Sequence, residues 1–245
     1  MPPAHLATDR VIADETLELR EYDFLFASNP EVEVSLTRLG IRRDQILPTT
    51  FGWTSDRFHD STPEPRLDRG VRALFVGSIG VRKGVPELLD AWQDAGVDGE
   101  LVLVGSVEPV IADMVERHTR DGRVRLTGHV KDVGAMYKSA DIFVFPTLEE
   151  GGPQVTYEAA GCGLPIITTP MGAARLVENG RSGVVVAPGS REQLTAALRK
   201  LAEDPGLRAS YGETAKAHAT AFDYRHVGRS RGRQLEEIAL SRRPA

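Results

Sequence analysis

The sequence predicts an α/β fold built on a doubly wound parallel sheet, and two observations carry this prediction. First, six short apolar runs recur along the chain, at residues 71–77, 100–105, 123–128, 141–146, 164–168 and 183–187. Runs that are apolar throughout are typical of strands buried on both faces of a sheet. Second, segments with helical periodicity lie between them, and strands that alternate with helices form parallel sheets. A chain of 245 residues, 41% of them hydrophobic, is long enough to bury such a core.

The region before residue 71 has a weaker pattern. Residues 1–22 show no clear periodicity, whereas residues 21–28 (EYDFLFAS) indicate a short apolar strand. Residues 30–40 indicate a brief helix with Pro30 in its first turn. Residues 59–70 (HDSTPEPRLDRG) are polar and contain two prolines, so we interpret them as a linker.

The helices of the predicted sheet are indicated by apolar spacing and by start signals. Between the first two strands, apolar residues repeat at i, i+3, i+4 and i+7, at Val85, Leu88, Leu89 and Trp92. A capping box formed by Ser190 and Gln193 predicts a helix after the last strand. We expect two further helices, at residues 205–221 and 224–240.

Composition and charge exclude several classes of protein. The net charge of −5 provides no general attraction for nucleic acid, so we expect no nucleic-acid partner. No apolar run approaches the ~20 residues of a membrane span, and the first residues (MPPAHLATDR) lack the apolar stretch of a signal peptide. The single cysteine, Cys162, lies between two glycines and is interpreted as a small buried residue. We therefore expect a cytoplasmic protein without an internal disulfide.

Residues 77–84 (GSIGVRKG) follow the first predicted strand, at the sheet edge where ligands of such folds bind. Glycine lets the backbone approach a ligand closely, and Arg82 and Lys83 stand where the next helix begins. Two cations beside a helix N-terminus suit a diphosphate. The segment lacks the ending of a Walker A loop and contains no G-x-G-x-x-G dinucleotide motif. From this segment alone, the alternative that both residues are solvated charges at a helix start stays open.

Two glutamates bracket a Gly-Gly-Pro corner after the fourth strand, in PTLEEGGPQVTYEAAGCGLPIITTP (residues 146–170). Glu150 precedes a helix that we expect from Pro153 to about Gly161, and Glu158 lies within its second turn. A carboxylate accepts hydrogen bonds from both members of a hydroxyl pair, so the two glutamates are candidates to hold two ends of one elongated ligand. The alternative is a capping Glu150 and a Glu158 bonded to the backbone, but a buried carboxylate on an apolar helix face needs a partner. The backbone amides that we expect to be free for negative charge are those of Gly151, Gly152 and Gln154.

Together these segments resemble the family-4 glycosyltransferases, which have the GT-B fold. The resemblance rests on the E-x7-E arrangement of Glu150 and Glu158, on FVGSIGVRKGVPELLDAW and on LTGHVKDVGAMYKSADIFVFP, and it covers about residues 71–221. It implies a carboxyl-terminal donor domain, one of two Rossmann-like domains that face a cleft. It also implies metal-independent transfer of a sugar from a UDP- or GDP-linked donor, with retention at the anomeric carbon and no separate cofactor.

The resemblance implies a role for each matched residue. Glu150 would bind hydroxyls of the donor sugar and Glu158 those of the ribose, while Arg82 and Lys83 would neutralise the departing diphosphate. The implied catalytic residues are therefore Arg82, Lys83 and Glu150. The implied donor-binding residues are Gly77, Ser78, Val130, Gly151, Gly152, Pro153, Gln154 and Glu158, with His129 and Val130 near the nucleobase. Two positions depart from the family pattern, since Ser78 replaces a frequent arginine and Gly152 replaces the usual aromatic residue.

The resemblance also implies a division of the chain. Residues 1–58 resemble the end of an amino-terminal acceptor domain, 59–70 form the linker, 71–221 the donor domain, and 222–245 a crossover helix and tail. Because most of the acceptor domain is missing, we expect the chain to bind a nucleotide-sugar but to transfer little sugar alone to its unidentified acceptor. An excised piece of a longer enzyme, a misplaced gene start and a split or decayed protein all stay open.

The predicted crossover helix is rich in arginine, at Arg225, Arg229, Arg231 and Arg233. We expect a solvated basic face there, with peripheral contact to anionic lipid at the inner membrane face as the alternative. We also expect Val227 and Leu235 to be exposed, because the domain that they would cover is largely missing.

Other functions fit the sequence in part or not at all. A nucleotide-sugar sensor or regulatory subunit that pairs with a second chain would use the same donor residues, and it stays open. A nucleotide-sugar epimerase would need an acid and a base in the cleft, and the histidines at positions 118, 129, 218 and 226 do not cluster. A nicotinamide dehydrogenase would need the missing glycine motif, and a metal hydrolase would need ligand spacing that the chain lacks.

Overall fold

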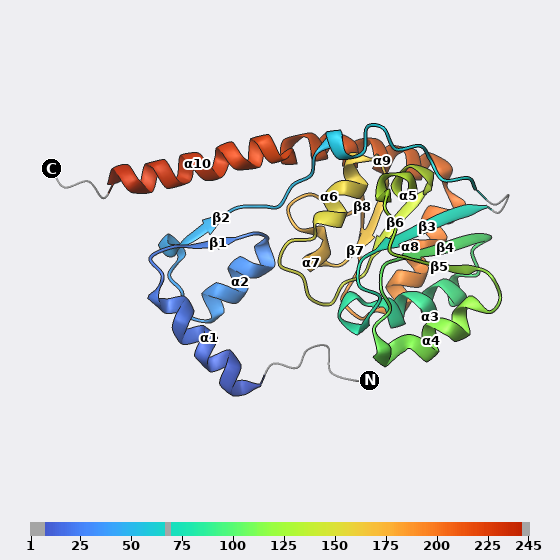
Figure 1. The fold of residues 1–245 in the computed structure, drawn as a ribbon, viewed down its shortest axis with the longest axis horizontal. Helices are drawn as coiled ribbons and strands as arrows, with labels where there is room; N and C mark the ends of the chain where they lie inside the picture. The colour runs from blue at the N-terminus through green and yellow to red at the C-terminus, as the bar shows by residue number, and fades with distance from the viewer. Residues whose placement is uncertain (1–7, 67–69, 242–245) are drawn as a thin grey trace.

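The structure, a computed structural model, describes residues 8–66 and 70–241, so parts of the predicted linker (67–69) and tail (242–245) lie outside the described residues. Its main feature is a six-stranded parallel sheet in the order β5-β4-β3-β6-β7-β8 (Figure 1). The strands are β3 (Val71–Val76), β4 (Gly99–Val104), β5 (Val124–Gly128), β6 (Ile142–Phe145), β7 (Ile166–Thr168) and β8 (Gly183–Val185). Each lies within a predicted run or overlaps it, and the predicted α/β class, a Rossmann-like half of a GT-B fold, is confirmed.

Helices cover both faces of this sheet. α3 (Val85–Ala95), α4 (Ala112–Thr119) and α8 (Arg191–Glu203) lie on one face (Figure 1). α5 (Val133–Ser139), α6 (Gln154–Gly161) and α9 (Pro205–Ala219) lie on the other, and the short α7 (Pro170–Ala173) follows β7. The order of the strands reverses between β3 and β6, and folds of this kind bind ligands at the carboxyl ends of the strands near such a reversal.

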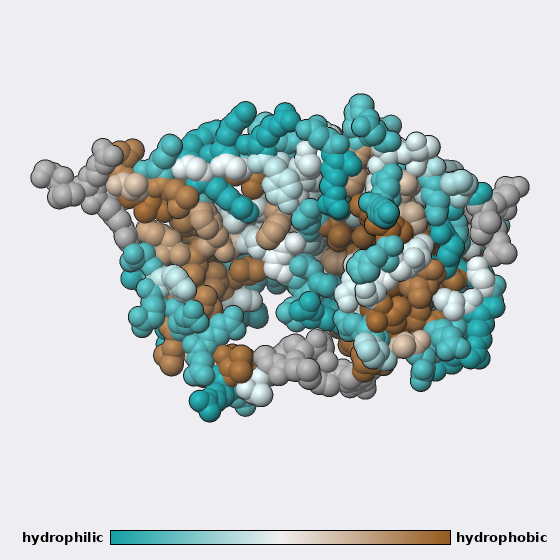
Figure 2. Space-filling view, in the orientation of Figure 1, coloured by the Kyte–Doolittle hydropathy of each residue, from teal (hydrophilic) through white to brown (hydrophobic). Residues whose placement is uncertain are grey.

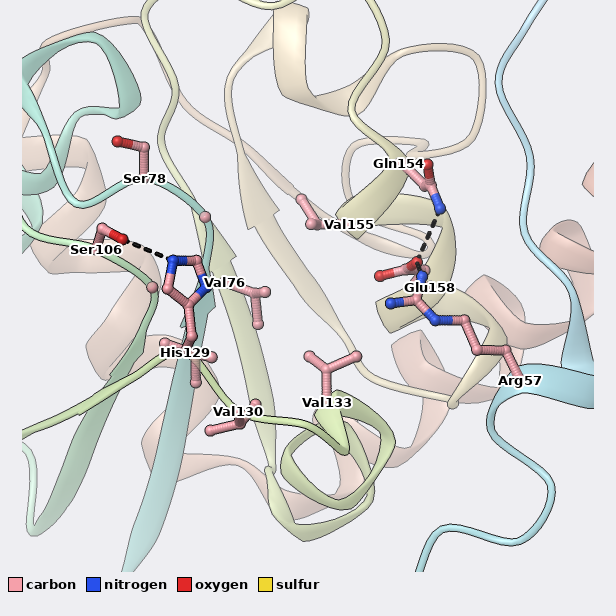
Figure 3. A pocket seen from close by; sticks show the side chains of 13 residues that line it. Arg57, Val76, Ser78, Ser106, His129, Val130, Val133, Gln154, Val155 and Glu158 are labelled. Atoms are coloured by element: carbon pink, nitrogen blue, oxygen red, sulfur yellow. Dashed lines mark hydrogen bonds and ion pairs between the residues drawn. The ribbon is translucent and has the colours of Figure 1, made fainter.

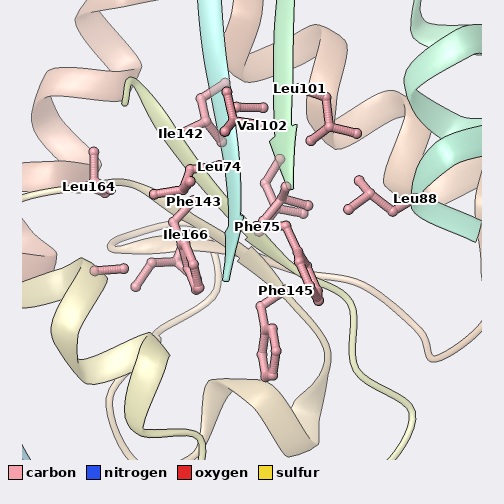
Figure 4. Packing of buried hydrophobic residues seen from close by; sticks show 14 of the residues in the cluster. Leu74, Phe75, Leu88, Leu101, Val102, Ile142, Phe143, Phe145, Leu164 and Ile166 are labelled. Atoms are coloured by element: carbon pink, nitrogen blue, oxygen red, sulfur yellow. The ribbon is translucent and has the colours of Figure 1, made fainter. Parts of the chain in front are cut away.

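The core of the sheet forms because its strands are apolar on both faces. Leu74, Phe75, Val102, Phe143 and Ile166 are completely buried, and they interlock across neighbouring strands (Figure 4). Strands of this composition can only be stable with a helical layer on each side. The sheet therefore provides a rigid base for the loops at its carboxyl edge.

The predicted capping box before α8 forms only in part. The Ser190 hydroxyl accepts a hydrogen bond from the Gln193 amide (3.3 Å), as expected. The Gln193 side chain, however, accepts from the Ala187 amide (2.8 Å). The reason is that the Ser190 amide already donates to the Ala187 carbonyl (3.1 Å), so it is not available to Gln193.

An amino-terminal lobe, residues 8–48, lies beside the sheet domain (Figure 1). It contains a parallel pair of strands, β1 (Leu25–Ala27) and β2 (Ile46–Pro48), with α1 (Asp9–Glu21) and α2 (Pro30–Arg38). β1 and α2 were predicted, whereas α1 was not. No residue of α1 is buried, and a helix without a buried face leaves little apolar periodicity in the sequence.

The last helix, α10 (Tyr224–Ser241), runs from the sheet domain back to the amino-terminal lobe (Figure 1). The prediction that Val227 is exposed is wrong, because it is 5% exposed and packs against Gly52, whereas Leu235 is 52% exposed as expected. The arginine face is only partly solvated, since Arg231 donates to the hydroxyl of Thr49 (2.7 Å) and to the carbonyl of Thr50 (2.5 Å). Among the described residues, no helix is long and apolar enough to cross a membrane.

Candidate functional site

A pocket of about 530 Å³ opens at the carboxyl ends of β3, β4 and β5, between these strands and α6 (Figure 3). Its walls are largely apolar, formed by Val76, Val104, Val130, Val133 and Val155. Its remaining lining residues are Arg57, Gly77, Ser78, Gly105, Ser106, His129, Gln154 and Glu158. The predicted donor-binding residues Gly77, Ser78, Val130, Gln154 and Glu158 are thus brought together in one hollow.

Glycines at the strand ends leave backbone on the pocket floor. Gly77 and Gly105 have φ angles of +150° and +140°, in the region that favours glycine. A Cβ atom on Gly105 would lie 1.9 Å from the carbonyl oxygen of Gly77, so no side chain fits between the two strand ends. A flat ligand or a phosphate can therefore approach the backbone closely.

Glu158 is the buried acid of the pocket. It lies on α6, is 4% exposed, and has three side-chain partners. Its Oε1 accepts from Arg57 Nη1 (2.8 Å) and Gln154 Nε2 (3.0 Å), and its Oε2 accepts from the Tyr137 hydroxyl (3.1 Å). Burial, together with the charge of Glu158, raises the pKa of Tyr137 well above its usual value, so this hydroxyl stays a neutral donor.

Arg57 was not predicted as a site residue. It is the last residue of the short helix η2 (Ser55–Arg57), which precedes the sheet domain, and its side chain is 55% exposed. The sequence did indicate that a buried Glu158 needs a partner. It gave no means of choosing that partner among the 30 lysines and arginines of the chain.

A second polar group faces Glu158 from the opposite wall of the pocket (Figure 3). There, Ser106 Oγ lies 2.7 Å from His129 Nε2, and Ser78 Oγ donates to Glu108 (2.9 Å). His129 and Val130 were expected near one end of the ligand and do line the pocket. Ser106 was missed, because a lone serine after an apolar strand carries no distinctive pattern.

Lys83 and Glu150 form an ion pair beside this pocket, and we call it the Lys83–Glu150 pair. The two side chains are 13% and 18% exposed, and Lys83 Nζ lies 5.6 Å from the centre of the Phe145 ring. The same ring lies 3.6 Å from the Cβ position of Gly77 on the pocket floor. Lys83 and Glu150 are not among the described residues that line the 530 Å³ pocket, but a single aromatic ring separates Lys83 from its floor.

Arg82 occupies a more open position next to this pair. Its guanidinium lies 3.8 Å from Glu149, and both side chains are about half exposed. Its backbone carbonyl accepts from the Leu148 amide (2.9 Å), which fixes the loop after β3 against the loop after β6. Both predicted cations precede α3 as expected, and Gly84, with a φ angle of +68°, makes the turn into that helix.

Two of the three backbone amides that were expected to be free at the Gly-Gly-Pro corner are hydrogen-bonded. The Gly152 amide donates to Glu150 Oε1 (3.3 Å) and the Gln154 amide to the Gly152 carbonyl (2.9 Å), so neither is a free donor. The carbonyl of Gly151 accepts from Ser28 and Asn29 of the amino-terminal lobe. Pro153 is the residue before α6 rather than its first residue. The corner is therefore held by its own bonds and by the lobe.

Cys162 follows α6 and is half-buried. Burial raises the pKa of its thiol to about 11, so it stays protonated at neutral pH. This fits the interpretation of Cys162 as a structural residue.

Comparison with known proteins identifies a family and several relatives that match most of the chain. Residues 70–204 match the family described as "Glycosyl transferases group 1". The capsular polysaccharide biosynthesis glycosyltransferase CapM of Staphylococcus aureus is 32% identical over 218 residues, which cover 86% of this chain and 56% of CapM. The lipopolysaccharide glucosyltransferase WaaG of Escherichia coli is 31% identical over 197 residues, covering 74% of this chain and 52% of WaaG. The chain spans about half the length of the curated relatives that it matches.

Solved structures share the fold. Sucrose-phosphate synthase from Thermosynechococcus elongatus superimposes with a TM-score of 0.83 at 22% identity, over 96% of this chain and 63% of that one. HepE of Anabaena superimposes with a TM-score of 0.81 at 19% identity, over 94% and 67% of the two chains. The six-stranded parallel sheet is the fold that these structures share, and the family match extends over residues 70–204. The chain therefore belongs to the group 1 glycosyl transferases.

Proposed function

We propose that the pocket and the neighbouring Lys83–Glu150 pair bind a nucleotide-sugar, and that the chain supplies the donor half of a retaining, metal-independent glycosyltransferase of family 4. The relatives CapM and WaaG, which are glycosyltransferases, support this proposal. So does HepE, which shares the fold and was solved in complex with UDP and glucose.

The buried carboxylate of Glu158 is the observation that carries the proposal. It sits at one side of a pocket whose walls are valine and whose floor is backbone. Apolar walls suit the faces of a nucleobase, and a carboxylate suits the hydroxyls of a ribose. A cation one aromatic ring away, at Lys83, suits the diphosphate that follows the ribose.

The proposed roles follow the position of each residue. His129 and Val130 contact the nucleobase, Glu158 binds the ribose, and Gly77 and Ser78 bind the phosphates. Lys83, assisted by Arg82, stabilises the negative charge that develops on the departing diphosphate. Glu150 orients hydroxyls of the transferred sugar, with Gly151, Gly152 and Pro153 shaping the loop that carries it. The nucleobase is uracil or guanine, and the acceptor binds from the side of the amino-terminal lobe.

A second candidate function is a nucleotide-sugar-binding subunit that pairs with another chain. One observation favours it: the described lobe pairs only two strands, and it leaves Phe26 on β1 43% exposed. Apolar side chains gather on the surface of this lobe (Figure 2). The two candidates differ in turnover, because only the first predicts transfer of sugar by the chain together with an acceptor domain.

Replacing Glu158 with alanine tests the proposal. We expect the affinity for a nucleoside and for its diphosphate to fall alike, by roughly 10-fold to 100-fold, because the variant loses a charged group that binds the ribose, which both ligands share. Isothermal titration calorimetry measures both affinities. Glu116→Ala, at an exposed glutamate on α4, is the matched control and should bind as the unaltered chain does. Unchanged nucleoside binding by Glu158→Ala would contradict the proposal.

A further inference from the structure

The hydrogen bonds around Glu158 leave little of its carboxylate free for a ligand. A carboxylate offers about four acceptor positions, two on each oxygen. On Oε1, Arg57 and Gln154 take both positions. On Oε2, the hydroxyl of Tyr137 takes one. One acceptor position on Oε2 therefore stays open toward the pocket.

The two oxygens also differ in how firmly their partners are held. Tyr137 is completely buried, so its bond to Oε2 is fixed by the core. Arg57 reaches Oε1 from outside the sheet domain, with a side chain 55% exposed. Arg57 can therefore be removed without opening the core.

Arg57 belongs to a segment, residues 49–58, that runs along α6 and sets the backbone position of Arg57. We call this segment the connector. Thr50 Oγ1 lies 2.5 Å from the Tyr157 hydroxyl, the Phe51 ring packs on Gly152, and the Trp53 ring packs on Gly161. The residue beside Arg57, Asp56, pairs with Arg225 of α10 (3.1 Å). A connector held at so many points along α6 places the guanidinium reproducibly against Glu158.

We propose that Arg57 is a positioning residue that limits how many ribose hydroxyls Glu158 can bind. By occupying Oε1 together with Gln154, it leaves Glu158 able to accept a hydrogen bond from one of the two ribose hydroxyls and not from both. This inference rests on the proposed function, since it assumes that a nucleotide ribose meets Glu158. It concerns the selectivity of the site for hydroxyl groups, which the proposed function alone does not specify.

The test compares a nucleoside diphosphate with its 2′-deoxy and 3′-deoxy forms by calorimetry, in the UDP or the GDP series, whichever binds. In the unaltered chain, loss of one hydroxyl should lower the affinity about tenfold or more, and loss of the other should change it less than about twofold. In Arg57→Ala, Oε1 regains an acceptor position, so loss of the second hydroxyl should also lower the affinity about tenfold. The readout is the ratio between the affinity for each deoxy ligand and the affinity for the parent nucleoside diphosphate. A variant that weakens the binding of all three ligands equally leaves this ratio unchanged.

Arg225→Ala is the matched control. It removes the contact between Arg225 and Asp56, the residue before Arg57, and leaves the Arg57–Glu158 bond in place. It should keep the selectivity for one hydroxyl. The inference is overturned if the unaltered chain loses affinity equally with either deoxy ligand, if Arg57→Ala keeps the original pattern, or if Arg225→Ala changes it as much as Arg57→Ala does. If neither UDP nor GDP binds at all, the proposed function itself fails, and the inference falls with it.

Discussion

Replacing Lys83 with alanine is expected to weaken the binding of a nucleoside diphosphate roughly 30-fold or more, while the affinity for the free nucleoside stays within about twofold. Two effects act in the same direction. The cation that faces the diphosphate is lost, and Glu150, whose side chain is 18% exposed, keeps a negative charge without its partner. In a largely water-excluded position, such an unpaired charge also repels the diphosphate.

Calorimetric titration of the variant with a nucleoside and with its diphosphate measures this difference. Arg82→Ala is the comparison, and its effect should be smaller because its guanidinium is about half exposed and lies 3.8 Å from Glu149. If Lys83→Ala lowers both affinities equally, the variant has lost its fold rather than a contact, and the role given to Lys83 has no support.

The largest effect on stability is expected from Arg72→Met. Arg72 Nε donates to Glu100 Oε1 (2.6 Å), and both side chains are 2% exposed. Removing Arg72 leaves the buried carboxylate of Glu100 with its longer ion pair to the partly exposed Arg125 (3.3 Å). Loss of one member of a buried ion pair costs about 3–5 kcal/mol. For a chain of this size, that corresponds to a fall in Tm of roughly 6–20 °C.

Thermal unfolding followed by circular dichroism measures the change. The double variant Arg72→Met, Glu100→Leu removes both charges, so it should recover most of the lost stability. Arg42→Met, at an exposed arginine that pairs with Asp44, serves as the control and should leave Tm unchanged. A Tm for Arg72→Met equal to that of the control would show that the pair contributes nothing.

The sheet and its helices were predictable because their signals are local. Runs that are apolar on both faces indicate buried parallel strands, and the same reasoning placed Gly77, Ser78 and Val130 at strand ends, where they do line the pocket. Glu158 was predictable as a partnered carboxylate because its helix is otherwise apolar on that face. In each case the information lies within one turn or one strand of the residue.

The features that were missed depend on contacts between distant segments. Arg57 and Glu158 are 101 residues apart, and nothing near either one indicates the other. The resemblance implies an aromatic residue at the position of Gly152. A Cβ atom there would lie 2.0 Å from the ring of Phe51, so an aromatic side chain from the connector occupies that space instead. Similarly, Glu64 of the polar segment interpreted as a linker pairs with Arg125 of β5 (2.6 Å), a contact that composition does not reveal.

The central claim is that the pocket at Glu158 and the Lys83–Glu150 pair bind successive parts of one sugar-nucleotide. Titration of the unaltered chain with UDP, GDP and the two free nucleosides, in the presence of EDTA, tests it most directly. We predict one saturable site that binds one of the diphosphates more tightly than its nucleoside, without a divalent metal. Absence of saturable binding by either diphosphate, or equal affinity for diphosphate and nucleoside, would contradict the claim.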